Sequence, residues 1–106
     1  MALQNEPFTE APKATTGQIA TLNELIEGWE VIEDGMPKLQ KRYSFDTYAA
    51  ALVFVNNVSV VAEELGHHPE ITFTWGAATV RWWSHASGGL TLNDFIMAAK
   101  TDALLE

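Results

Sequence analysis

The sequence predicts an α+β fold in which three helices pack on one face of a four-stranded antiparallel sheet. Segments with helical spacing alternate with pairs of short strand-like segments, in the order α-β-β-α-β-β-α. A chain of 106 residues fits one domain, and 47% hydrophobic residues can supply its core. We expect residues 1–14, which lack any hydrophobic period, to be a flexible N-terminal tail, and residues 15–106 to form a single domain.

The first part of this domain should contain a short helix and a hairpin. Residues 15–27 carry Ile and Leu at helical spacing, and Gly28 follows as a natural helix end. Residues 29–32 and 38–45 read as strands joined by a turn that contains Gly and Pro. The second strand alternates between apolar and polar residues, except that Lys41 interrupts its apolar side.

Residues 46–65 combine strand propensity with helical length. Five valines favour a strand, but a run of 20 residues without Gly or Pro is too long for a usual strand. The apolar residues also fall into two helical stripes. We therefore predict a helix that is buried on two sides, against the sheet and against another subunit, and that ends at Gly66 and Pro69.

A second hairpin and a last helix complete the domain. Residues 71–75 and 78–84 alternate cleanly, and we place Gly76 at the first central position of a type II′ turn. Continued outward, this register sets His68 opposite His85, with Cβ atoms ~5 Å apart.

The last helix should begin after Thr91 and run to about Leu104. Thr91 is a good N-cap residue, and Asp94 stands three residues later, as in a capping box.

Composition excludes several classes of function. A net charge of −8 argues against nucleic acid and against an anionic membrane surface. The absence of cysteine excludes disulfides, thiolate zinc sites and cysteine nucleophiles. Residues 1–16 contain no apolar signal region, and no stretch approaches transmembrane length, so we expect a cytoplasmic protein.

The three histidines of the chain are expected to share one small region. His67 and His68 are adjacent, and His85 stands at the far end of the following hairpin. Histidine is the side chain whose unperturbed pKa lies nearest physiological pH, which suggests proton transfer or metal binding. Capping of the preceding helix could explain His67 or His68 but not His85. Zinc is less favoured, because neither an H-x-H nor an H-x-x-x-H spacing is present.

Three further side chains are candidates for the same site. Glu63 lies in the last turn of a helix, where the macrodipole disfavours negative charge, and such a local conflict tends to mark function. It is four residues before His67, so it could orient an imidazole or bind a donor edge of a ligand. A solvated surface carboxylate is an equally good interpretation of Glu63. Asp94 completes the Thr91 cap, and it could also support the site. Trp83 lies on the same predicted face as the site and could stack on a flat heterocycle, whereas Trp82 should fill the core.

Two motifs at a fixed distance carry a family resemblance. E-x-x-x-H-H-P covers residues 63–69, and H-x-x-x-G-L-T-x-x-D covers residues 85–94. With these motifs the chain resembles the pterin-4a-carbinolamine dehydratases, over nearly all of its length after residue 15. The departures are mild and lie at Ser84, at the Trp82-Trp83 pair and in the turn at residues 77–78.

The resemblance implies dehydration of 4a-hydroxytetrahydrobiopterin, or of a bacterial analogue, to quinonoid dihydropterin, which recycles the cofactor of aromatic amino acid hydroxylases. It implies a homodimer or homotetramer that uses neither a metal nor another cofactor. The family's active-site histidines fall on His67, His68 and His85, and its acidic positions on Glu63 and Asp94. Two alternatives stay open: a non-catalytic binding, assembly or coactivator module on this fold, and a metal-dependent hydrolase.

Overall fold

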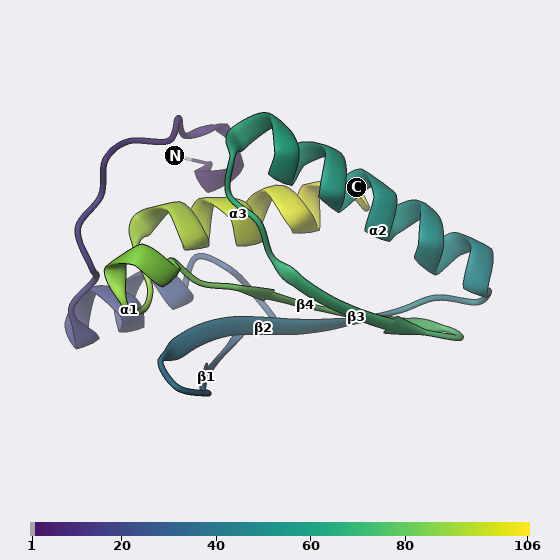
Figure 1. The fold of residues 1–106 in the computed structure, drawn as a ribbon, viewed down its shortest axis with the longest axis horizontal. Coiled ribbons are helices and arrows are strands. Elements are labelled where there is room, and N and C mark those ends of the chain that lie inside the picture. Colours follow the sequence, from purple (N-terminus) through teal and green to yellow (C-terminus); the bar gives the residue numbers. More distant parts are fainter. Residues whose placement is uncertain (1) are drawn as a thin grey trace.

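Helices cover one face of a four-stranded antiparallel sheet in the computed structural model, which describes residues 2–106 (Figure 1). The predicted α+β class and the order of elements are confirmed. In chain order, the elements are η1 (Leu3–Asn5), α1 (Thr16–Asn23), β1 (Glu30–Glu33), β2 (Pro37–Ser44), α2 (Tyr48–Leu65), β3 (Glu70–Thr74), β4 (Ala77–Trp82), η2 (His85–Ser87) and α3 (Leu92–Ala103).

The core lies between the sheet and helices α2 and α3. The strand order is β1-β2-β4-β3, so β2 and β4 form the centre of the sheet and β3 is an edge. Leu39 pairs with Trp82 across the two central strands, and both side chains are fully buried. Phe54 of α2 and Phe95 of α3 belong to the same core and are buried on the helical side of the sheet. Burying one such large apolar side chain contributes about 1.5–3 kcal/mol.

The register of the second hairpin differs from the predicted one. Thr74 pairs with Ala77, whereas the predicted turn pairs Trp75 with Ala78. Gly76 therefore occupies the second central position of the turn, where its φ is +79°. Shifting the pairing by two residues leaves every side chain on the same face, so the hydrophobic alternation is equally compatible with both registers.

The end of α2 was predicted correctly from the local sequence, and the end of α1 was not. Gly66 adopts φ +65° and ends α2, as predicted. The first helix is shorter than predicted: α1 ends at Asn23, and turns lead on to Gly28. Ile26 lies in these turns with only 3% of its surface exposed, so tertiary packing of this side chain replaces the last helical turn.

Lys41 interrupts the apolar side of β2 because it binds a carboxylate at the end of α3. Its Nζ lies 2.9 Å from Asp102 Oδ1, and Tyr43 donates its hydroxyl hydrogen to the same oxygen. Trp29 Nε1 donates to Asp102 Oδ2 at 3.1 Å. Burial, and then the hydrogen bond to Asp102 and its charge, raise the pKa of Tyr43 far above its usual range. This polar cluster ties the end of α3 to the sheet.

Helix α2 has 18 residues and a mean hydropathy of 1.2, so by length and composition alone it could cross a membrane. The expectation that no stretch approaches this length therefore needs correction. Core helices of soluble proteins reach the same length and hydropathy. Phe54 and Val58 of α2 are buried against the sheet, while Val53 and Val60 on its outer side are 58% and 56% exposed.

The N-terminal segment expected to be flexible makes defined contacts with α3. Leu3 of η1 is 4% exposed, and Lys100 Nζ donates to the carbonyl oxygen of Gln4 at 2.6 Å. The segment runs past the helices before it reaches α1 (Figure 1). Its mobility in solution, and the domain boundary at residue 15, stay predictions.

Candidate active site

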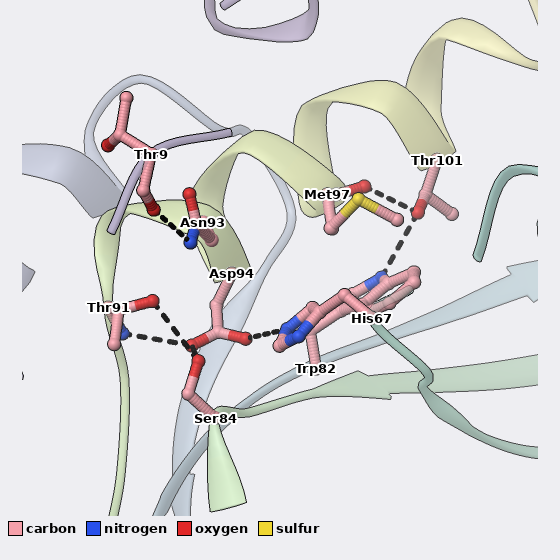
Figure 2. A network of polar contacts seen from close by, with 9 residues as sticks. All are labelled: Thr9, His67, Trp82, Ser84, Thr91, Asn93, Asp94, Met97 and Thr101. Atoms are coloured by element: carbon pink, nitrogen blue, oxygen red, sulfur yellow. Dashed lines mark hydrogen bonds and ion pairs between the residues drawn. The ribbon is translucent and has the colours of Figure 1, made fainter. Parts of the chain in front are cut away.

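His67 stands directly after the end of α2 and points to the beginning of α3. Its backbone N–H donates to the carbonyl oxygen of Ala62 at 3.2 Å, which closes the helix end. Its Nε2 lies 2.6 Å from Asp94 Oδ1, and 19% of the imidazole side chain is exposed (Figure 2). Because a carboxylate oxygen can only accept, Nε2 carries the hydrogen of this bond. The basic position of the neutral ring is then Nδ1.

Asp94 is fully buried and has donors on both carboxylate oxygens. Oδ1 accepts from His67, while Oδ2 accepts from Ser84 Oγ at 2.7 Å and from the Thr91 backbone N–H at 2.9 Å. The last of these bonds confirms that Asp94 caps α3, as predicted. A buried carboxylate is tolerated when its oxygens are paired, and the positive end of α3 favours its charge. The hydrogen bonds of Asp94 thus connect the residues that follow α2 and β4 to the start of α3 (Figure 2).

Trp82 provides a flat platform for the imidazole of His67. The two ring centroids lie 5.7 Å apart at an interplanar angle of 9°, so the rings are stacked. Trp82 is completely buried, and its Nε1 donates to Thr101 Oγ1 at 3.1 Å. The predicted core position of Trp82 is confirmed, but its contact with His67 was missed. Ser84, and Phe8 with its ring 5.7 Å from the His67 ring, were missed as well.

His68 forms a second imidazole–carboxylate pair at the surface. Its Nε2 lies 2.5 Å from Glu63 Oε1, and the two side chains are 60% and 80% exposed. Sequence spacing suggested that Glu63 could orient His67, four residues later. In the structure Glu63 instead contacts His68, and Nε2 of His67 is paired with Asp94. An exposed pair of this kind holds its geometry only weakly.

His85 begins η2 and is exposed to solvent. The prediction that position 85 faces position 68 is wrong: the observed register, continued outward, would set residue 83 opposite residue 68. Within residues 2–106, His85 makes no hydrogen bond to His67 or His68. It follows Ser84 directly, however, and Ser84 donates to Asp94. His85 is therefore adjacent to the residue that binds Asp94, and Asp94 in turn binds His67.

Trp83 directly follows the last residue of β4 and is half-buried against the core cluster. Lys38 Nζ is 4.1 Å from the Trp83 ring centroid, which is a cation–π contact. The aromatic contacts of the His67 ring within residues 2–106 are with Trp82 and Phe8, and not with Trp83. That Trp83 stacks on a flat heterocycle at the site stays a prediction.

Across residues 2–106, no three His, Asp or Glu side chains gather closely enough to hold a metal ion. What the arrangement offers is a half-buried imidazole fixed by a buried carboxylate and an indole ring. A histidine held in this way has a defined tautomer and can exchange a proton through its other nitrogen.

A family model and similar proteins from two bacteria carry the same family description. The family model described as pterin 4 alpha carbinolamine dehydratase matches residues 12–104. A protein of Syntrophotalea carbinolica, provisionally named pterin-4-alpha-carbinolamine dehydratase, is 50% identical over 91% of this chain and 87% of its own length. A protein of Marinobacter nauticus with the same provisional name is 47% identical over 90% of this chain and 86% of its own.

Two solved structures share the fold. A crystal structure titled transcriptional coactivator/pterin dehydratase, from Brucella melitensis, superimposes with a TM-score of 0.82 at 26% identity, covering 89% of this chain and 99% of that one. A second, titled as a pterin dehydratase-like protein that is a RuBisCO assembly factor in the alpha-carboxysome, gives a TM-score of 0.62 at 28% identity. The superposition covers 74% of this chain and 89% of that one.

Proposed function

Because this chain belongs to the pterin 4 alpha carbinolamine dehydratase family, we propose that it dehydrates a 4a-hydroxytetrahydropterin to the quinonoid dihydropterin by histidine acid–base catalysis. The activity would recycle the pterin cofactor of aromatic amino acid hydroxylases. One observation carries the mechanism: the imidazole of His67 is half-buried and tied through Nε2 to the buried Asp94. Its Nδ1 has no hydrogen-bond partner among residues 2–106.

The reaction needs two proton transfers and no redox step. The C4a–O bond breaks as the hydroxyl takes up a proton and leaves as water, and a double bond forms between N5 and C4a as N5 loses its proton. One neutral and one protonated imidazole can serve as base and acid, each worth ~10²–10⁴-fold in rate. We assign this pair to His67 and His85, and the holding of the pterin to His68.

Support for the acidic residues differs between them. Asp94 contacts His67 from a fully buried position, so it can hold the tautomer that leaves Nδ1 free to accept a proton. Glu63 contacts the exposed His68 and would orient it or bind the edge of the pterin. Trp83 stays a proposed pterin contact, and its ring also makes a cation–π contact with Lys38.

A direct assay tests this proposal. The 4a-carbinolamine would be generated in situ by a phenylalanine hydroxylase, and its dehydration followed by rapid-mixing absorbance with and without the purified protein. His67→Ala and His85→Ala should each lower the rate by about tenfold or more while the far-UV circular dichroism is unchanged. Undiminished turnover in both folded variants would rule out the acid–base pairing.

The exposed side of α2 supports a further part of the proposal, self-association into a dimer or tetramer. Leu52, Val53 and Val60 are 41%, 58% and 56% exposed on a helix whose opposite side is buried. An apolar stripe of this kind is typical of a surface that another subunit covers. We also propose a cytoplasmic location.

The second candidate is a binding or assembly function, favoured by the titles of the two structural relatives, which name a coactivator and an assembly factor. The dehydration assay distinguishes the two functions. A protein that acts only as a binding module would show no dehydratase activity in its natural form.

A further inference from the structure

The N-terminal segment reaches the imidazole that is central to the proposed function. The ring of Phe8 lies 5.7 Å from the ring of His67, centroid to centroid, at 74° to its plane. Phe8 is half-buried and packs against the core cluster. Together with the stacked ring of Trp82, it gives His67 two aromatic neighbours from opposite parts of the chain.

Four contacts hold residues 2–14 along α3 and the loop before it, and they lie on both sides of Phe8. They are the burial of Leu3 at 4% exposure, the 2.6 Å bond from Lys100 Nζ to Gln4 O, the 2.9 Å bond from Asn93 Nδ2 to Thr9 O, and the 2.7 Å bond from Ala14 N to Leu90 O. Figure 2 shows the Asn93–Thr9 bond beside the Asp94 network. The backbone on either side of Phe8 is thus anchored to the helix that carries Asp94.

We propose that residues 2–14 form a strap over α3, and that Phe8 is a positioning residue for His67. The hydrogen bond to Asp94 holds one edge of the imidazole, and Trp82 covers one of its faces. A second ring set nearly at right angles restricts movement of the imidazole and covers part of it. The effect on catalysis rests on the proposed function, whereas the effect on the imidazole itself does not.

Chemical labelling measures the effect on the imidazole without any substrate. Diethyl pyrocarbonate acylates accessible neutral imidazoles, and proteolysis with mass spectrometry gives the rate at each histidine. Cleavage after Glu64 and Glu70 releases the peptide 65–70, which holds His67 and His68. The exposed His85 is an internal reference for the reagent concentration. Unchanged far-UV circular dichroism and an unchanged urea midpoint exclude a general loosening of the fold, which would also raise the rate at His67.

Phe8→Ala should raise the His67-to-His85 ratio of labelling rates by about 2- to 10-fold, the range that the loss of one aromatic pair represents. Phe8→Leu, which keeps most of the apolar volume, should give a smaller rise. Glu10→Ala is the matched control, because Glu10 is an exposed strap residue with no hydrogen bond or ion pair within the described chain, and it should leave the ratio unchanged. In the dehydration assay, Phe8→Ala should lower kcat by a similar factor and leave KM unaltered.

An unchanged labelling ratio in folded Phe8→Ala would overturn the strap proposal, even if the natural protein is an active dehydratase. If circular dichroism shows that Phe8→Ala does not fold, an unchanged ratio in Phe8→Leu would overturn it. A raised ratio in a protein that lacks dehydratase activity would support the positioning of His67 and contradict the proposed function instead.

Discussion

Replacing Asp94 by asparagine should leave the fold intact and reverse the tautomer of His67. Oδ2 accepts two hydrogen bonds, from Ser84 and from the Thr91 backbone, so the amide oxygen should keep this side of the group. The amide NH₂ would then face Nε2 of His67, now 2.6 Å from Oδ1. Because an amide NH₂ can only donate, Nε2 must become an acceptor, and the ring hydrogen moves to Nδ1.

The structure sets the size of the effect. A hydrogen bond to a charged group contributes about 1.5–3 kcal/mol, and Asp94→Asn weakens three such bonds without emptying the site, so we expect a loss of about 2–3 kcal/mol in the free energy of unfolding. Loss of the basic Nδ1 should lower the dehydration rate by ~10²-fold or more. Urea unfolding measures the first quantity, rapid-mixing absorbance the second, and ¹⁵N NMR of the imidazole reports the tautomer directly.

Glu63→Gln is the matched control, since it makes the same chemical change beside His68. That pair is exposed at 60% and 80%, so the free energy of unfolding should change by less than about 0.5 kcal/mol. The reasoning would be refuted if Asp94→Asn kept the Nε2–H tautomer of His67, or if it kept the full dehydration rate with the tautomer reversed.

Three further predictions concern the rest of the molecule. Because the pKa of Tyr43 is raised in the folded protein, only the unfolded chain releases the phenol proton at a pH just above the ordinary tyrosine pKa. The free energy of unfolding should therefore fall above about pH 10, by up to about 1.4 kcal/mol per pH unit, and Tyr43→Phe should flatten this fall in urea titrations at pH 9 to 11. An equal slope in both proteins would contradict the assignment. Gly76→Ala should lower the free energy of unfolding by about 1–2 kcal/mol, because φ is +79° and the added Cβ would lie 3.2 Å from Phe45 O. Gly17→Ala, whose Cβ would have nothing within 4 Å, should be neutral or stabilising. A thermal melt of each variant compares the two. Val53→Asn combined with Val60→Asn should reduce self-association in sedimentation equilibrium, and a natural protein that is monomeric at high concentration would argue against the α2 interface.

Features that depend on neighbouring residues could be predicted from the sequence. The length of the run at residues 46–65 outweighed its valines and identified α2, and Gly66 ended it with φ +65°. The Asp94 cap of α3 also follows from spacing, because the Thr91 backbone N–H and Oδ2 belong to one helical turn. The two motifs, at residues 63–69 and 85–94, indicated the family.

Contacts between distant segments were decided by the tertiary structure. The second hairpin has two registers that place the same side chains on the same face, so the alternation of the sequence does not select between them, and the structure shows the one that pairs Thr74 with Ala77. The pairing of His67 with Asp94, 27 residues later, requires α2 and α3 to meet over the end of β4. Helical and strand periods state which face of an element is buried but not which element covers it, so the partners of His67 emerge only when the helices are packed on the sheet.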